Sequence, residues 1–518
     1  MLTKISFLLL SYSLLFAASV YADPDKAVRP EVTETGYSWR RVKYAENNVF
    51  TSENPPDAPK PAAIAPERVT PWEQMPNKSY LIPALEIPGF LALLNIYDRY
   101  AYPDQLQDGK KVYSSTFSST WEHLRKQNWV FDQDPFNVNQ FGHPYQGATM
   151  YGLARSANLG FWESAAYSNA GSFLWKMAGE TDPPSINDQI TTGTAGSLLG
   201  EALFRMAELV LNDGGSHPDL WHEAGAAVIS PPTAFNRMAF GDRYKAKFPS
   251  LNPATFWRFQ LGASESNSSK NNAIIDFGMS YGLPGKPGYT YTRPLDYFDF
   301  ELSGQTRADN PVENIMLRGL LYGKDYRAGE KYRGIWGLYG SFDYLSPSAF
   351  RVSTTALSLG TTGQYWLAPG VALQGSLLGG VGFGAAGTTP NEFGERDYHY
   401  GVAPQGLLAL RLLFGNRAAL EVVGRGYYVN GTGHFTTVGS TAYDNAGGAE
   451  KIVRVKTAFN IRVYGRHGLG LQFVESIRDS QYANQPSRHQ SEGVTSLVYT
   501  FTGDSFFGAV EWRDNVNR

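Results

Sequence analysis

The stretch "KIVRVKTAFNIRVYG", Lys451 to Gly465, alternates two kinds of side chain along its length. One face carries apolar or β-branched residues at every second position from Val453 to Val463, and the other carries Arg454, Lys456, Asn460 and Arg462. A period of two predicts a β-strand with one apolar and one polar face. The stretch exceeds the about 9–11 residues that a tilted strand needs to cross a bilayer, as is typical of a transmembrane β-barrel.

The same period continues on both sides of this stretch, between residues 254 and 513. It recurs in "LDYFDFELSG" from Leu295 and "GVALQGSLLGGVGFG" from Gly370, and a last strand is expected in "FFGAVEW" from Phe506. Tight connections ("RAGEK", "LAPG", "GNR", "RHG") alternate with long ones ("GTTPNEFGER", the segment after Val429, "DSQYANQPSRHQ"). Short turns at one end and long loops at the other predict an outer-membrane barrel of about 12–14 antiparallel strands. The alternative is a large soluble all-β exported domain.

The start of the chain predicts export. Residues 1–22 combine Lys4, an apolar run and small residues before a cleavage site after Ala22, as in a secretory signal peptide. The chain has no Cys and a formal net charge of −3. It therefore lacks disulfides, and neither a basic run nor an excess of positive charge points to nucleic acid as a partner. The predicted location is the cell outer membrane, reached through the periplasm.

Two segments separate the leader from the barrel. Residues 23–79 are rich in proline, which favours an extended periplasmic linker over helix or sheet. Residues 80–245 show helical periodicity and many small residues, including "SINDQITTGTAGSLLGEALFR" from Ser185. The predicted fold class is thus α+β: a C-terminal transmembrane antiparallel barrel, at 254–513, with an N-terminal helical domain that plugs or underlies it.

The helical segment holds the candidate site residues. If the protein is an enzyme, the acid–base candidates are His143, Glu180, Asp188 and Glu201. A structural interpretation is favoured, in which most charges pair locally. Ser185 and Asp188 fit a capping box, Glu201 and Arg205 lie at i, i+4, and Arg155 is close enough to pair with Glu163. The expected polar network is Arg155, Glu163, Asp188, Glu201 and Arg205.

The polar face of the barrel strands predicts a basic lumen face, formed by Arg425, Arg454, Lys456 and Arg462. Such a face attracts anions or lipid headgroups, carries ordinary solvated charge, or pairs with acids of the helical segment. No motif for a metal ion or an organic cofactor is present in the sequence, so neither is expected. The expected partners are outer-membrane lipid and a small solute or lipid ligand, and the oligomeric state is open.

Part of the helical segment resembles a bacterial family of domains of unknown function, numbered 3943. The matching features are a His-Pro followed by Gly and Tyr, a Trp and Glu pair, an Asn-Asp before a Gly-rich helix ending in Gly-Glu, and a late Asn-Arg. These fall on His143, Pro144, Gly147, Tyr151, Trp175, Glu180, Asn187, Asp188, Gly200, Glu201, Asn236 and Arg237. The resemblance covers about 100–160 residues outside the barrel. It implies an exported, outer-membrane-associated protein with no assigned activity.

Three functions remain open from the sequence. The first is a non-enzymatic plugged channel or envelope scaffold that handles lipid or small solutes. The second is a membrane-embedded enzyme that modifies lipid or glycan with a His and carboxylate pair. The third is an adhesion or partner-binding barrel that acts through its long loops.

Overall fold

A computed structural model describes residues 78–512 of the chain, apart from gaps at 104–105, 108–109, 127–128, 132–133, 216, 242–251, 268–271, 307–311, 348–349, 389–397, 432–435, 439–440, 444–446, 483–484 and 505–506. These described residues belong to one compact unit. The predicted signal peptide and almost all of the predicted linker lie outside the described residues.

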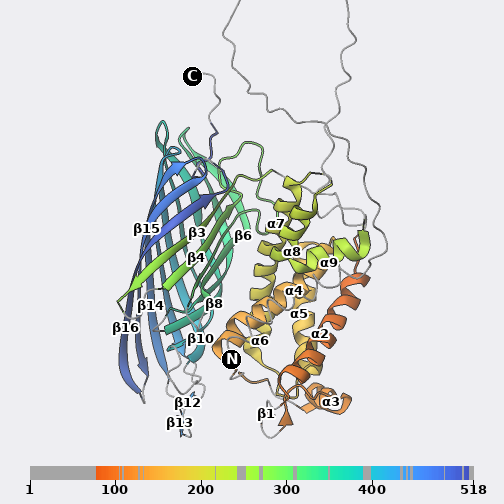
Figure 1. The fold of residues 1–518 in the computed structure, drawn as a ribbon. Helices are drawn as coiled ribbons and strands as arrows, with labels where there is room; N and C mark the ends of the chain where they lie inside the picture. The colour runs from red at the N-terminus through yellow and green to blue at the C-terminus, as the bar shows by residue number, and fades with distance from the viewer. Residues whose placement is uncertain are drawn as a thin grey trace, which may run out of the picture. The chain divides into compact units, whose positions relative to one another are not determined.

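The first half of the described chain is helical and is called here the helical region, residues 78–241 (Figure 1). Its α-helices are α2 (Leu81–Ala101), α3 (Phe117–Lys126), α4 (His143–Ser156), α5 (Phe161–Ala178), α6 (Ile186–Asp188), α7 (Gly196–Asp213), α8 (Leu220–Ile229) and α9 (Pro231–Phe240). Two π-helical segments, η3 (Val138–Gly142) and η4 (Gln189–Ala195), lead into α4 and α7. Two short strands, β1 (Leu106–Gln107) and β2 (Lys110–Lys111), pair with each other.

Local sequence explains where several helices begin. Pro144 and Pro231 occupy first-turn positions of α4 and α9, where the missing N–H costs no hydrogen bond. The backbone N–H of Gly160 donates to the Glu163 carboxylate at 2.7 Å, which caps α5. The Asp219 side chain accepts from the backbone N–H groups of Trp221 and His222 at the start of α8.

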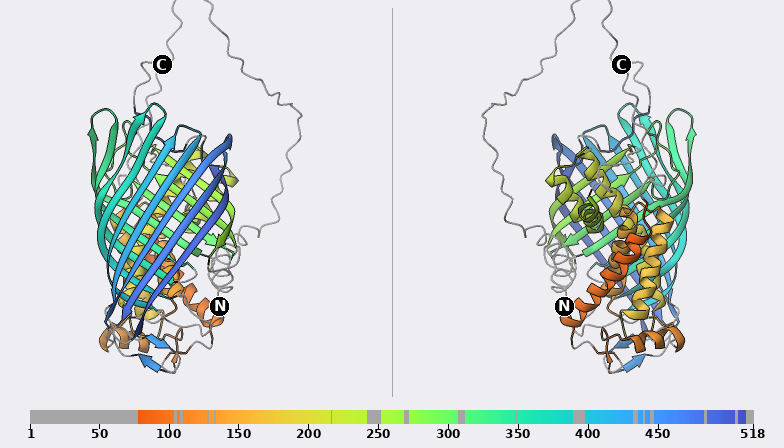
Figure 2. Two further views of the ribbon diagram at one scale, coloured as in Figure 1. Left: turned by 90° about the vertical axis from the view of Figure 1, so that its left-hand side faces the viewer. Right: turned by 90° about the vertical axis from the view of Figure 1, so that its right-hand side faces the viewer.

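The second half forms a closed barrel of 12 antiparallel strands (Figures 1 and 2). The strands are β3 (Thr255–Ser266), β4 (Asn272–Tyr281), β5 (Phe298–Gln305), β6 (Val312–Ala328), β7 (Tyr332–Leu345), β8 (Phe350–Ala368), β9 (Val371–Thr388), β10 (Tyr398–Phe414), β11 (Ala418–Gly431), β14 (Gly448–Tyr464), β15 (His467–Tyr482) and β16 (Gln485–Thr502). Strand β16 pairs with β3 and closes the ring. The short pair β12 (Thr436–Val438) and β13 (Thr441–Tyr443) lies between β11 and β14 in the sequence. The predicted fold class is confirmed.

The predicted alternation of connections is confirmed at one end of the barrel. Four tight turns there each contain a glycine with positive φ, a conformation that favours glycine: Gly329, Gly370, Gly415 and Gly465. Two expectations at the C-terminal side were wrong. "DSQYANQPSRHQ" is not a long loop, because β15 and β16 extend through most of it. The described residues of "FFGAVEW" form no strand. The alternation also has an exception at the tight-turn end, because the connection from Gly282 to Tyr297, between β4 and β5, is long.

The alternation within each strand separates a lumen face from an outward face. Arg454 and Lys456 of β14 form ion pairs with acids of strands across the barrel, so their face is the lumen. Val453, Val455 and Phe459 point the other way and are exposed. The sequence of β14 therefore predicted both faces correctly.

The helical region contacts the outward face of the barrel and does not fill its lumen. On β7, Ser341 and Asp343 face the lumen, whereas Phe342 and Tyr344 face outward and share one buried cluster with the helices. Phe131 stacks on the outward-facing rings of Phe383 in β9 and Tyr400 in β10. Phe136 packs on Tyr344 of β7. The helices were expected to plug or underlie the barrel, and they instead pack on its outward face. The sequence could not predict this, because its pattern gives no partner for an apolar strand face.

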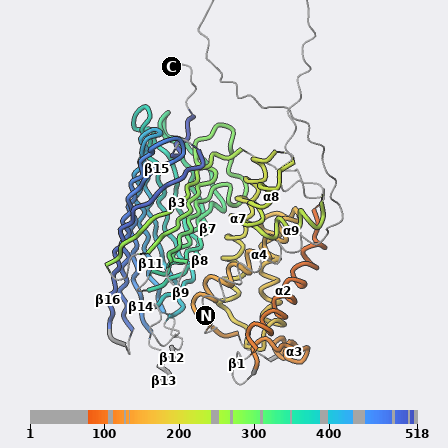
Figure 3. The backbone as a smooth tube through the Cα atoms, viewed as in Figure 1, coloured from red at the N-terminus to blue at the C-terminus, as the bar shows by residue number. Residues whose placement is uncertain are grey.

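Figure 3 traces the single path of the chain from the helical region through the barrel strands. Residues 507–512 follow the last strand and pack at the tight-turn end. Phe507 and Val510 join a buried cluster with lumen-facing residues that include Phe256, Trp366 and Leu413. The lumen is thus occupied at this end by the chain's own C-terminal segment.

Candidate functional site

Buried charged residues gather in three places, which we name by their members. The His143 cluster comprises His143, Lys176, Glu180 and Asp188. The Glu201 cluster comprises Arg155, Glu201 and Arg205. The lumen network comprises ten of the charged residues that face the barrel interior: Arg258, Asp276, Glu301, Glu313, Asp343, Arg411, Glu421, Arg425, Arg454 and Lys456.

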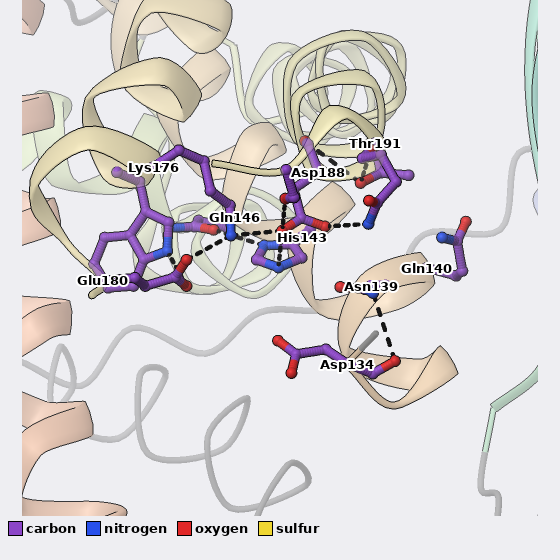
Figure 4. Close-up of polar contacts among 12 residues, drawn as sticks. Asp134, Asn139, Gln140, His143, Gln146, Lys176, Glu180, Asp188 and Thr191 are labelled. Atoms are coloured by element: carbon purple, nitrogen blue, oxygen red, sulfur yellow. Dashed lines mark hydrogen bonds and ion pairs between the residues drawn. The ribbon is translucent and has the colours of Figure 1, made fainter. Parts of the chain in front are cut away.

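The His143 cluster draws on three helices of the helical region (Figure 4). His143 begins α4, Lys176 lies in the last turn of α5, and Asp188 ends α6. The Lys176 Nζ lies 2.5 Å from both Asp188 Oδ2 and Glu180 Oε2. The His143 Nε2 lies 3.3 Å from Asp188 Oδ2. Two carboxylates and two cations therefore meet in a net-neutral group.

Neutral side chains complete the His143 cluster. Asp188 also accepts from the hydroxyl of Ser185 at 2.5 Å and from the side-chain amide of Asn187 at 2.8 Å. The Trp175 indole donates to Glu180 Oε1 at 2.7 Å. Ser185 precedes α6 but its side chain bonds to Asp188 and caps no backbone N–H, so the predicted capping box was wrong. The Asp188 carboxylate is completely buried, and it pairs with His143 and Lys176 from other helices.

Burial and charge together set the protonation of this cluster. Burial alone would lower the pKa of His143, but the charge of Asp188 outweighs it and raises the pKa to about 9. Burial alone would raise the pKa of Asp188, but His143 and Lys176 hold it well below its usual range. Burial, and then the charges of Glu180 and Asp188, raise the pKa of the nearby Asp134. The arrangement favours a charged His143 paired with a charged Asp188.

The protonated His143 links the stability of the helical region to pH. Its pKa is raised above the ordinary 6.5, so its stabilisation is complete below pH 6.5 and is lost as the pH rises through about 9. The free energy of unfolding should fall across this window by about 1.4 kcal/mol per pH unit for one bound proton. Urea unfolding of the vesicle-inserted protein, followed by circular dichroism at several pH values, measures the slope.

The variant His143→Gln should remove most of this slope, and the same substitution at the surface residue His222 should leave it. An unchanged slope in His143→Gln would contradict a charged His143 in the folded protein.

The members of the Glu201 cluster come from α4 and α7. The Arg155 Nε and Arg205 Nε donate to Glu201 at 2.8 Å and 2.7 Å, and the Tyr151 hydroxyl donates at 2.7 Å. The predicted pairing of Glu201 with Arg205 is confirmed. The predicted pairing of Arg155 with Glu163 was wrong, because Glu163 lies on the surface and pairs with Lys78 at 2.6 Å.

The Glu201 cluster also connects the helical region to the barrel. The Arg205 guanidinium donates to Asp296 Oδ1 at 3.0 Å and to the carbonyl of Pro294 at 2.9 Å. Both residues lie in the connection between β4 and β5. Glu201 therefore holds Arg205 in position for a contact outside the helical region. His143 and Glu201 belong to different clusters, so the proposed catalytic candidates do not converge on one point.

Three glycines of "SINDQITTGTAGSLLGEALFR" give the helices their close approach. A side chain on Gly196 would meet the backbone of Gly147 in α4 at 2.6 Å, and one on Gly200 would meet Tyr151 at 2.8 Å. Gly193 faces Asn169 of α5, with the added carbon 2.1 Å from the amide oxygen. The absence of side chains lets α4, α5 and α7 pack closely enough to bury both charged clusters.

The lumen network crosses the barrel. The Arg454 Nη1 lies 3.2 Å from Glu313 Oε1, although β14 and β6 are six places apart in the ring of 12 strands. Lys456 reaches Glu301 of β5 at 3.2 Å, and Arg425 reaches Asp343 of β7 at 3.4 Å. Each of the three bases thus meets an acid from a distant strand.

The predicted bases therefore do face the lumen, but the lumen face is not basic, because acids lie opposite them. Arg425, Arg454 and Lys456 face the lumen, and Arg462 is half-buried near a tight turn at its end. The acids opposite them are Asp276, Glu301, Glu313, Asp343 and Glu421, and they come from the barrel, not from the helical region. Alternation in "LDYFDFELSG" placed Glu301 on a polar face, but the closure of the barrel decides which strand lies opposite it.

A cavity of about 80 Å³ remains in the lumen between Arg258, Glu301, Arg318, Arg411 and Glu421.

The C-terminal segment is fixed inside the lumen by polar side chains. Gln364 donates to the carbonyl of Val510 and Gln374 to that of Gly508, both at 2.7 Å. The Arg411 guanidinium donates to the carbonyl of Phe507 at 2.7 Å. These bonds satisfy backbone groups of a segment that forms no strand, and they hold it in the barrel mouth.

Among the described residues, no group of three or more His, Asp or Glu side chains is arranged to hold a metal ion.

The chain is similar to solved outer-membrane proteins over about half of its length. The NanC porin shares 7% identity over 47% of this chain and 98% of its own, with a TM-score of 0.26. OmpT, an outer membrane protein of Vibrio cholerae, shares 6% over 48% and 96%, with a TM-score of 0.19. The translocator domain of the autotransporter NalP from Neisseria meningitidis shares 14% over 53% and 99%, with a TM-score of 0.20. The comparison with curated proteins gives no match.

A family model matches the helical region, which confirms the resemblance seen in the sequence. The residues that it covers include every member of the His143 and Glu201 clusters. Residues 128–232 of this chain match the domain of unknown function DUF3943.

Proposed function

We propose that the chain is a non-enzymatic outer-membrane β-barrel that forms a channel for small polar or charged solutes, closed in the state described here. The plug consists of the lumen network and the C-terminal segment 507–512. The observation that carries this proposal is the set of ion pairs that cross the lumen between distant strands. The helical region supports the barrel from its outward face.

The outward face of the barrel supports a location in the outer membrane. Leu359 of β8 and Leu497 of β16 are 66% and 65% exposed, and Val463 of β14 is 66% exposed. Strand β8 has 19 residues and β16 has 18, more than the about 9–11 that cross a bilayer. A closed barrel leaves no unpaired strand edge for lipid to meet. Exposed leucine and valine side chains are costly in water and stable in hydrocarbon.

The lumen side chains favour a channel over a rigid scaffold. Buried ion pairs contribute little net stability, and well-packed apolar residues would fill a permanent core more favourably. Charges inside a membrane barrel commonly mark a pathway for polar solutes. Acids and bases are both present in the lumen network, so a solute would meet both signs of charge once the pairs separate.

Bilayer conductance tests the proposal. The wild-type barrel should stay almost silent. A variant that ends at Asp504 and carries Arg454→Ser with Glu313→Ser should show discrete current steps, because both parts of the plug are weakened. Removing both partners of the ion pair avoids leaving one buried charge unpaired. The surface pair Lys78→Ser with Glu163→Ser is the matched control and should stay silent.

A folded variant is recognised by its heat-modifiable migration on a gel. A folded but silent barrel after both changes would contradict the channel and favour a closed scaffold.

The other two functions receive less support. In the His143 cluster, Asp188 is completely buried and Lys176 is 2% exposed, and both pair with other members. This favours a role in packing over acid–base chemistry on a lipid or glycan. The adhesion function depends on the loop between Asn430 and Glu450, and most of its side chains lie outside the described residues.

A further inference from the structure

We infer that helices α2 and α5 contact the acyl chains of the membrane that the barrel spans, so that helices and barrel are embedded side by side. This inference rests on the proposed outer-membrane location of the barrel. It assigns the exposed face of the helical region to lipid.

Helix α5 exposes apolar side chains and buries several polar ones. Its exposed positions carry Trp162, Ala166, Ala170, Phe173 and Leu174. Its buried positions include polar residues spaced four apart, namely Ser164, Ser168, Ser172 and Lys176. A surface helix in water turns its polar face outward and its apolar face to the core. Helix α5 thus places these four polar residues against the protein and the five apolar ones toward the surroundings.

Helix α2 also exposes an apolar face, although Ile87 and Leu91 on its other side are buried. Leu85 and Leu93 are each 67% exposed, and Ile96 is also exposed. The exposed face carries no charged residue before Arg99 in the last turn. On the inward side, the side-chain amide of Asn95 donates to the carbonyls of Tyr113 and Gly179, and Asp98 is buried. Helix α2 thus turns Asn95 and Asp98 toward the protein, whereas its exposed positions before Arg99 carry apolar residues.

The position of these helices identifies the occupant of their exposed face. The helical region packs on the outward face of the barrel, through contacts such as Trp162 on Tyr322 of β6 and Phe136 on Tyr344 of β7. Elsewhere around the ring, the same face exposes leucine and valine. The helical region lies beside the barrel wall (Figure 1), so we assign the exposed sides of α2 and α5 to the medium that covers this apolar barrel face.

The lengths of the two helices fit a bilayer. Helix α2 has 21 residues, and α5 has 18. At about 1.5 Å per residue they measure about 32 and 27 Å, against about 30 Å of hydrocarbon. Among the described residues, α2 is the one helix with the length and apolar composition to cross a membrane.

Close packing between these helices also resembles that of membrane helices. A side chain on Gly171 of α5 would meet Met150 of α4 at 2.3 Å and Ile87 of α2 at 2.9 Å. The Ser168 hydroxyl of α5 donates to the carbonyl of Gly147 in α4 at 3.0 Å. Small residues at helix contacts and hydroxyls bonded across them replace the hydrophobic driving force that lipid does not supply.

Site-directed spin labelling of the full chain tests the inference, because the chain contains no Cys. Labels at Leu85→Cys, Leu93→Cys and Leu174→Cys are compared in phosphatidylcholine vesicles for collision with oxygen and with a water-soluble nickel complex. The barrel position Leu359→Cys is the lipid reference, and the turn position Glu330→Cys is the water reference. The oxygen-to-nickel ratio at the three helical positions should match Leu359 and exceed Glu330 by about tenfold, because the polar complex is excluded from hydrocarbon.

Two results at the helical positions would overturn the inference. Access to the nickel complex would place the face in water. Shielding from both reagents would show that protein covers it, either residues 23–77 of this chain or a partner. The Leu359 label tests the outer-membrane location of the barrel independently. Nickel access at Leu359 would contradict that location, whereas nickel access at the helical positions alone would contradict only the lipid contact of α2 and α5.

Discussion

Replacing Asp188 with alanine should destabilise the helical region by about 3–5 kcal/mol. The Asp188 carboxylate is completely buried and pairs with Lys176 at 2.5 Å and His143 at 3.3 Å. Its removal takes from two buried cations the carboxylate that they share, and it also removes the acceptor of the Ser185 hydroxyl and of the Asn187 side-chain amide. Urea unfolding in vesicles, followed by circular dichroism at 222 nm, measures the loss while gel migration reports the barrel separately.

The matched control for this prediction is a surface ion pair. Glu163→Ala removes the partially exposed partner of Lys78 and should cost about 1 kcal/mol or less. Replacing Lys176 with Met in addition to Asp188→Leu should recover part of the lost stability, because no lone charge then remains. Equal losses in Asp188→Ala and Glu163→Ala would contradict the structural importance of the His143 cluster.

Gly147→Ala should have a comparably large effect through packing alone. The added carbon would lie 1.7 Å from the carbonyl oxygen of Thr192 and 3.1 Å from the Cα of Gly196. Both contacts are with backbone, so α4 must move away from the η4 segment and α7. Overpacking of a rigid interior costs about 1–3 kcal/mol, and a backbone clash of this size should cost about 3 kcal/mol or more.

Gly89→Ala in α2 provides the opposite control. Nothing lies within 4 Å of the added carbon, so the variant should gain about 0.5–1 kcal/mol from the better helix propensity of alanine. The same unfolding measurement applies to both variants. A neutral Gly147→Ala would show that α4 and α7 do not pack as closely as described.

The barrel could be predicted from sequence because its signals are local. Period-two alternation in β14 and positive-φ glycines in the tight turns depend on neighbouring residues only. The pairing of Glu201 with Arg205 is also local, at i, i+4 on one helix.

Contacts between distant segments could not be predicted in the same way. The polar face of β14 was visible, but the acids opposite Arg454 and Lys456 depend on how the sheet closes. The pairing of Arg155 with Glu201, 46 positions away, depends on the packing of α4 against α7. The exposed apolar faces of α2 and α5 are periodic in sequence, but periodicity does not reveal which face meets the protein. For this reason the helices were expected inside or beneath the barrel, whereas they lie on its outward face.

The position of the helical region relative to the barrel is the central claim, and a pair of disulfide experiments tests it most directly. A side chain on outward-facing Gly340 of β7 would lie 2.9 Å from the Leu198 methyl of α7, whereas the neighbouring Ser341 faces the lumen. In this Cys-free chain, mild oxidation should link Leu198→Cys to Gly340→Cys and should not link it to Ser341→Cys. Crosslinking to Ser341→Cys, with none to Gly340→Cys, would place the helices in the lumen and contradict the account.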